Sequence, residues 1–237
     1  MKFTKTEAET LERIFRWRRD VRHFQTTPVA EDVLERLRHA MDSAPSVGNS
    51  RPWRVIRIND PTLRAGVRAN FNLCNADAAT DYKDDQHREY LRLKLAGLDA
   101  APVQLAVFTL TDPAEGHGLG RRTLPETLRQ STAMAIHTLW LAARAENIGI
   151  GMVSILDPRA IERLLDVPAG WELSAYLCLG HAEFTDDTPL LHRSGWQENF
   201  PTEWDVRQRA IASRPSTSRC ASRCAASRSS VSSTPAA

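Results

Sequence analysis

The sequence lacks any long run of apolar residues. No run approaches the roughly 18–20 residues that a helix needs to cross a bilayer, so the sequence predicts no integral membrane protein. The N-terminal stretch MKFTKTEAETLERIFRWRRD carries charges where an export signal has an apolar segment. We therefore expect a protein that is neither secreted nor membrane-bound.

Cysteine is scarce and irregularly spaced. The four cysteines make neither a disulfide framework nor a zinc pattern, and the CxxxC spacing of the last two is not by itself a metal site. The residues concerned are Cys74, Cys178, Cys220 and Cys224. We expect no bound metal, and a reducing, cytoplasmic setting fits this usage.

Excess positive charge is also absent from most of the chain. The formal net charge is +2, but residues 212–237 contain four arginines and no acid, which leaves residues 1–211 at −2. No basic face indicates a nucleic-acid partner. Residues 212–237 are rich in Ser, Ala and Arg, so we predict a disordered tail after one domain at 1–211. The tail's basicity leaves an RNA- or membrane-binding role open, although a non-functional extension is favoured.

Apolar periodicity and breakers predict helices that alternate with strands. Helices are expected at 5–18, 29–42, 84–98, 125–146 and 158–165, with a short one opening at Pro61. Strands are expected at 53–58, 103–110, 151–156 and 173–180. This order predicts an α+β sandwich, with a mixed central sheet flanked by helices on both faces.

The segment RRDVRHF, residues 18–24, is the first candidate for chemistry. On a helical turn, Arg18 and Arg22 would share one face and could grip a phosphate, while Asp20 would project elsewhere. A solvated charge run with internal salt bridges explains the same spacing.

Two further segments are rich in small residues. APSVGNSRPW, residues 44–53, offers amides and small polar groups that can approach a planar ligand, although a plain turn would have the same composition. ENIGIGMVSI, residues 146–155, has a GxG that follows a helix, which argues against a dinucleotide-binding fold. Ser154 lacks a GxSxG context, so a hydrolase elbow is unsupported.

Together the three segments resemble the FMN-binding nitroreductase family in order and spacing. Within it, the chain resembles the branch of 5,6-dimethylbenzimidazole synthases: Asp20 stands where ordinary nitroreductases have serine, and Ser154 lies in a VSI motif. YLRLKLAGLDAAPVQLAVF (90–108) and LWLAARAENIGIGMVSILDP (139–158) support the same branch. The resemblance covers roughly residues 11–205. Arg51 and Met152 depart from it, where glutamine and tryptophan are usual.

The resemblance implies that reduced FMN is the substrate. With O2 it would be fragmented to 5,6-dimethylbenzimidazole, the lower ligand of vitamin B12, and erythrose 4-phosphate. Asp20 would be the catalytic acid or base, and Ser154 would orient a proton or a flavin oxygen. Because Asp20 lies among arginines, we expect a depressed pKa, which favours a base or a purely electrostatic role over an acid. The expected FMN-binding residues are Arg18, Arg19, Asp20, Val21, Arg22, Pro45, Ser46, Asn49, Ser154 and Ile155.

The resemblance also implies partners. We expect a homodimer with FMN sites built from both chains, which the apolar helix at 125–146 favours, and a separate flavin reductase that supplies reduced FMN. An NAD(P)H-dependent nitroreductase or flavin reductase is the main alternative, and Asp20 discriminates against it. A flavin storage or sensor protein without turnover is a third possibility.

Overall fold

The computed structural model describes residues 1–80 and 97–207. Most of the helix expected at 84–98 and the tail expected at 212–237 lie outside the described residues. The chain divides into two units, Met1–Asn199 and Phe200–Ala237. In the second unit, residues 200–207 are described, and they are exposed and form neither helix nor strand. The expected domain at 1–211 stays a prediction.

The first unit contains a four-stranded sheet in the order β1-β2-β4-β3. The strands are β1 (Trp53–Arg57), β2 (Val103–Leu110), β3 (Gly149–Val153) and β4 (Trp171–Gly180). Every pairing between these strands is antiparallel, so the expectation of a mixed sheet was wrong for the described strands. A helix between two strands implies that those strands are parallel only when the helix carries the chain back to the edge of the sheet at which the first strand began. The seven-residue helix α7 between β3 and β4 spans only about 10 Å.

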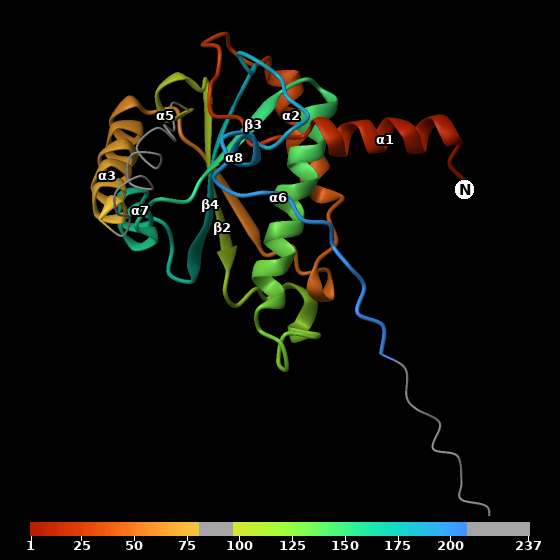
Figure 1. Cartoon of the computed structure of the whole chain (residues 1–237). Coiled ribbons are helices and arrows are strands. Elements are labelled where there is room, and N and C mark those ends of the chain that lie inside the picture. The colour runs from red at the N-terminus through yellow and green to blue at the C-terminus, as the bar shows by residue number, and fades with distance from the viewer. Residues whose placement is uncertain (81–96, 208–237) are drawn as a thin grey trace, which may run out of the picture. The chain divides into compact units, whose positions relative to one another are not determined.

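Helices cover both faces of this sheet, as predicted (Figure 1). On one face lie α2 (Glu31–Asp42) and α6 (Thr127–Ala145), and on the other lie α3 (Pro61–Ala79) and α7 (Pro158–Leu164). Each face has its own buried apolar cluster. The α+β architecture is therefore confirmed.

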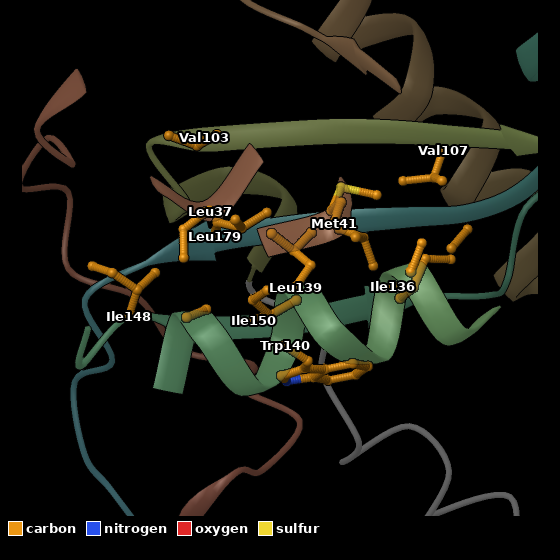
Figure 2. Packing of buried hydrophobic residues seen from close by; sticks show 14 of the residues in the cluster. Leu37, Met41, Val103, Val107, Ile136, Leu139, Trp140, Ile148, Ile150 and Leu179 are labelled. Carbon is orange, nitrogen blue, oxygen red and sulfur yellow. The ribbon is translucent and has the colours of Figure 1, made fainter. Parts of the chain in front are cut away.

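The cluster on the α6 face shows how the two sides of that helix differ. Figure 2 shows Leu139 pointing toward Met41 of α2, while Trp140 lies on the other side of α6. The indole Nε1 of Trp140 donates to the carbonyl of Arg19, 3.3 Å away. Helix α6 thus packs on the core with one side and supports the segment after the first helix with another.

The first helix, α1 (Lys5–Trp17), projects beyond α6 (Figure 1). A capping box between Thr4 and Glu7 fixes its start, and none of its residues is buried. Leu11 and Phe15 are exposed on it. The remaining short elements are η1 (Val47–Asn49), α5 (Gly97–Ala100), η2 (Glu115–Gly118) and α8 (Leu190–Arg193).

Two boundaries differ from the sequence expectation in ways that matter for the site. The helix opened by Pro61 is long, with 19 residues, and Asp60 caps its start through the amides of Thr62 and Leu63. Strand β3 begins at Gly149 and ends at Val153, so the residues from Ser154 onward lie in a loop. The strand starts early because Asn147, with a φ of 59°, ends α6 abruptly.

No helix in 1–80 or 97–207 is both long enough and apolar enough to span a membrane.

Candidate functional site

The arginine-rich segment after α1 is extended rather than helical. Helix α1 ends at Trp17, and Arg18 has extended backbone angles. Asp20 then forms a parallel bridge with Ile150 of β3, and the amide of Val21 donates to the Ile150 carbonyl, 2.9 Å away. The helical-face argument for Arg18 and Arg22 was therefore wrong. In extended chain, alternate residues share a side, so Asp20 lies with Arg22 instead of projecting elsewhere.

Two glycines of β3 allow this segment to approach so closely. A Cβ on Gly151 would lie 2.0 Å from the carbonyl oxygen of Val21. A Cβ on Gly149 would lie 2.8 Å from Cγ2 of Val21. The two glycines of GIGMV are thus required because the backbone around Val21 lies directly against β3. Glycine often serves this role where a strand packs closely on another backbone.

Asp20 links the segment to the end of β3 through its side chain. Its Oδ1 accepts from the Met152 amide at 2.9 Å, and its Oδ2 accepts from Nε of Arg22 at 3.4 Å. Burial raises the pKa of Asp20 above its ordinary value, and the Met152 amide, Arg22 and Arg18 oppose that shift only in part. The expectation of a depressed pKa was wrong, because the sequence shows the neighbouring charges but not the desolvation.

The three arginines are engaged differently. Arg19 donates to the carbonyls of Phe15 and Arg16, where it caps the C-terminal end of α1. The Arg18 guanidinium lies 5.3 Å from the ring centroid of Trp140. The Arg22 side chain is only 14% exposed, and among the described residues it forms an ion pair with Asp20.

Arg22 has donors to spare for an anion. A guanidinium carries five N–H donors, and the contact with Asp20 uses one of them at a long distance. The hollow beside Arg19, Asp20 and Arg22 holds about 50 Å³. Sites for ligands of drug or cofactor size occupy roughly 300–1,000 Å³. This hollow fits part of such a ligand.

The second candidate segment is a tight turn around η1. The Ser46 hydroxyl accepts from the Arg51 amide at 3.1 Å, and the Val47 amide donates to the Ser131 hydroxyl of α6 at 3.0 Å. Gly48 has a φ of 57°, and a Cβ there would lie 3.0 Å from the Gly116 carbonyl oxygen. Pro45 and Asn49 are exposed beside this turn.

The two candidate segments contact α6 at different positions. Helix α6 holds one through Trp140 and the other through Ser131. Nine residues of helix separate these contacts, or about 14 Å along the axis. The predicted FMN-binding residues therefore form two groups, one at 18–22 and one at 45–49.

Ser154 and Ile155 lie with the first group. They follow β3 directly, two and three residues after the Met152 amide that Asp20 holds. Ser154 is exposed, so its hydroxyl is accessible, whereas Ile155 packs partly against the buried cluster beneath it. The two residues that depart from the family pattern are accessible as well. Met152 is 40% exposed, and the Arg51 side chain lies at the surface.

Sequence reasoning missed the residues that support these groups. Ser131 and Trp140 were read only as parts of an apolar helix, and the Met152 amide carries no signal in the sequence. In the part of the chain that the structure describes, no group of three or more potential ligand side chains could hold a metal ion.

Comparison with known proteins confirms the resemblance. The profile of the nitroreductase family matches residues 15–181. A 5,6-dimethylbenzimidazole synthase of Rhodobacter capsulatus is 63% identical over 207 residues, which cover 87% of this chain and 100% of that protein. One of Rhodospirillum rubrum is 48% identical over 84% of this chain and 94% of that protein.

The fold also matches solved structures. An iodotyrosine deiodinase crystallised with FMN and 3-iodo-L-tyrosine superposes with a TM-score of 0.66 at 20% identity, over 85% of this chain and 100% of that one. The sequence and fold matches agree. The chain therefore belongs to the nitroreductase family, in the branch that contains the two 5,6-dimethylbenzimidazole synthases.

Proposed function

We propose that the protein is a 5,6-dimethylbenzimidazole synthase that fragments reduced FMN with O2, giving 5,6-dimethylbenzimidazole and erythrose 4-phosphate. The observation that carries the proposal is the half-buried carboxyl of Asp20, which accepts from Nε of Arg22 and from the Met152 amide at the end of β3. The 63% identity over the whole length of a named synthase supports it independently. Reduced FMN supplies the ring that becomes the product and the electrons that O2 accepts, and the rest of its pyrimidine ring leaves as a third fragment.

The arginines hold the phosphate end of the substrate. Arg22 is little exposed and has unused donors, so a phosphate oxygen can take the place of solvent without breaking an existing strong bond. Arg18 is fixed above Trp140 and supplies a second cation. Arg19 acts mainly on the end of α1, and it shapes the site through the backbone.

Asp20 exchanges a proton with the substrate. The raised pKa of its carboxyl brings proton uptake closer to neutral pH than is usual for aspartate, so it can serve as an acid as well as a base. The Met152 amide donates to Oδ1 at 2.9 Å, whereas Oδ2 has only the longer contact with Nε of Arg22 at 3.4 Å, so Oδ2 is the oxygen that exchanges the proton. The exposed Ser154 hydroxyl orients a proton or a flavin oxygen.

The complete site requires two chains. Residues 18–22 and 45–49 are held at different positions along α6, through Trp140 and Ser131, and we infer that each chain contributes one group to a shared site, as the family resemblance implies. The exposed Leu11 and Phe15 of α1 offer an apolar surface for the partner. The apolar character of α6 is a weaker argument than the sequence suggested, because eight of its residues are buried within their own chain.

The test is product formation with an external source of reduced FMN. Purified protein is incubated with FMN, NADH, air and a separate flavin reductase, and 5,6-dimethylbenzimidazole is sought by mass spectrometry. We expect product only when the reductase is present, since the proposed substrate is free reduced FMN. Consumption of NADH without added reductase, with FMN recovered intact, would instead identify an NAD(P)H-dependent flavin reductase or nitroreductase.

Two variants test the roles of Asp20 and Ser154 separately. Asp20→Asn keeps an oxygen for the Met152 amide but loses the titrating group, so FMN binding should persist while product formation falls about 10²–10⁴-fold. Ser154→Gly should slow fragmentation more than it weakens binding, because the backbone remains and one hydroxyl is lost. A normal yield from Asp20→Asn would remove Asp20 from the chemistry.

A further inference from the structure

The loop between β3 and α7 carries Ser154 and is held at both ends by side chains from other parts of the chain. Before Ser154, the Met152 amide donates to Oδ1 of Asp20 at 2.9 Å. After it, the Asp157 amide donates to Oδ1 of Asn70 on α3 at 3.0 Å. The loop is thus anchored two residues before and three residues after Ser154.

The support on the Asn70 side is rigid. Asp157 caps α7 through Oδ1, which accepts from the amides of Arg159 and Ala160 at 2.9 and 3.2 Å. Helices α3 and α7 lie so close that a Cβ on Gly66 would come within 2.8 Å of Leu164. Because α3 and α7 are packed in contact, a side chain on α3 can fix the start of α7 and the loop before it.

Asn70 makes this connection with one atom. Its Oδ1 receives the Asp157 amide, and the Cys74 thiol lies 3.9 Å from the same oxygen. Asn70 is only partly exposed, and nothing in the sequence motifs singles it out. Replacement of Asn70 by alanine would remove the oxygen that accepts from the Asp157 amide, and it would thereby release one end of the loop.

We propose that Asn70 is a positioning residue that holds the loop 154–157 so that Ser154 faces the flavin. The inference rests on the proposed function, and it adds to that function a residue outside the flavin-binding motifs. Asn70 acts through the Asp157 amide and does not itself touch the substrate. Small displacements of a catalytic group cost large factors in rate, because the reacting geometry is lost.

The experiment compares three variants in a single turnover with reduced FMN and O2. Asn70→Ala removes the acceptor, Asn70→Asp keeps an oxygen at the same place, and Asn72→Ala is the matched control on the exposed surface of α3. We expect Asn70→Ala to lower the rate constant for product formation about 10–100-fold, with FMN affinity changed less than about threefold. Asn70→Asp should restore most of the rate, and Asn72→Ala should leave it unchanged.

A double-mutant cycle separates positioning from general damage. If Asn70 acts through Ser154, then Asn70→Ala in a Ser154→Ala background should cost less than about a further twofold. An equal loss in both backgrounds, or an unchanged rate in Asn70→Ala alone, overturns the proposal.

Amide hydrogen exchange separates this inference from the proposed function. The Asp157 amide should exchange faster in Asn70→Ala than in the wild type or in Asn72→Ala. If the wild type forms no product, the proposed function fails, and faster exchange still supports the anchoring by Asn70. Unchanged exchange at Asp157 overturns that anchoring whatever the activity.

Discussion

Gly151→Ala is the most informative perturbation, because one added carbon meets a backbone atom. The new Cβ would lie 2.0 Å from the Val21 carbonyl oxygen, so the segment before Phe24 must move away from β3. That movement breaks the bond from the Val21 amide to the Ile150 carbonyl and pulls Asp20 away from the Met152 amide.

The expected loss follows from these contacts. Overpacking a fitted interior costs about 1–3 kcal/mol. Each of the two hydrogen bonds contributes about 0.5–1.5 kcal/mol net. The free energy of unfolding should therefore fall by about 2–6 kcal/mol. For a domain of this size, Tm should drop by about 10 °C.

Gly149→Ala provides the matched control on the same strand. Its Cβ would meet the side chain of Val21 at 2.8 Å rather than its backbone, and a side chain can shift more cheaply. We expect a loss of stability about half that of Gly151→Ala or less. Urea unfolding measures both variants, and flavin fluorescence titration measures FMN affinity, which should fall most in Gly151→Ala. A Gly151→Ala protein with wild-type stability and FMN affinity would refute the close pairing of residues 18–22 with β3.

Three further predictions follow from the site and the composition. The folded state raises the pKa of Asp20, so it holds that proton more tightly than the unfolded chain, and the free energy of unfolding falls as pH rises from about 4 through the raised pKa. Urea midpoints of Asp20→Asn, relative to wild type, should thus increase from pH 4 to pH 7, and a decrease would contradict the raised pKa. Arg22→Ala should weaken reduced-FMN binding about 10- to 150-fold, since a hydrogen bond to a charged group contributes roughly 1.5–3 kcal/mol. Riboflavin, which lacks the phosphate, should bind both proteins equally in the same titration, and an equal loss for riboflavin would make Arg22 structural. Deleting residues 212–237, which hold almost no large apolar side chain, should leave Tm and turnover unchanged, and a drop in either would show that these residues contribute.

Local signals in the sequence located most of the elements. The strand expected at 103–110 coincides with β2, because its apolar run is buried on both faces. The expected starts of the helices at Pro61 and at residue 158 match α3 and α7. In the structure, Asp60 and Asp157 cap these helices just before a proline at the first helical position.

The errors arose where contacts distant in sequence decide the structure. Residues 18–22 are extended because Asp20 and Val21 pair with Ile150, a contact between positions about 130 residues apart that the sequence does not show. The direction of each strand depends on the route of the chain outside the sheet, which alternation of helices and strands does not specify. The pKa of Asp20 is raised because the carboxyl is partly removed from water. The sequence shows the neighbouring arginines, which lower the pKa, but it does not show this desolvation.

The candidate site was predictable as a set of motifs but not as a geometry. Family resemblance proposes Arg18, Asp20, Arg22 and Ser154 as site residues, and these stay predictions. Trp140, which contacts the segment of Arg18 and Arg19, and Asn70, which accepts from the Asp157 amide, have no motif of their own. Supporting contacts of this kind are made by single atoms across the fold, so they become visible only in three dimensions.

The central claim is that reduced FMN is consumed as a substrate. The most direct test is a single turnover, in which anaerobic protein with a stoichiometric amount of chemically reduced FMN is mixed with O2, and flavin and 5,6-dimethylbenzimidazole are quantified together. The account predicts that one 5,6-dimethylbenzimidazole appears for each flavin lost in the wild type, and that Asp20→Asn returns oxidised FMN instead. Quantitative recovery of oxidised FMN from the wild-type protein would contradict it.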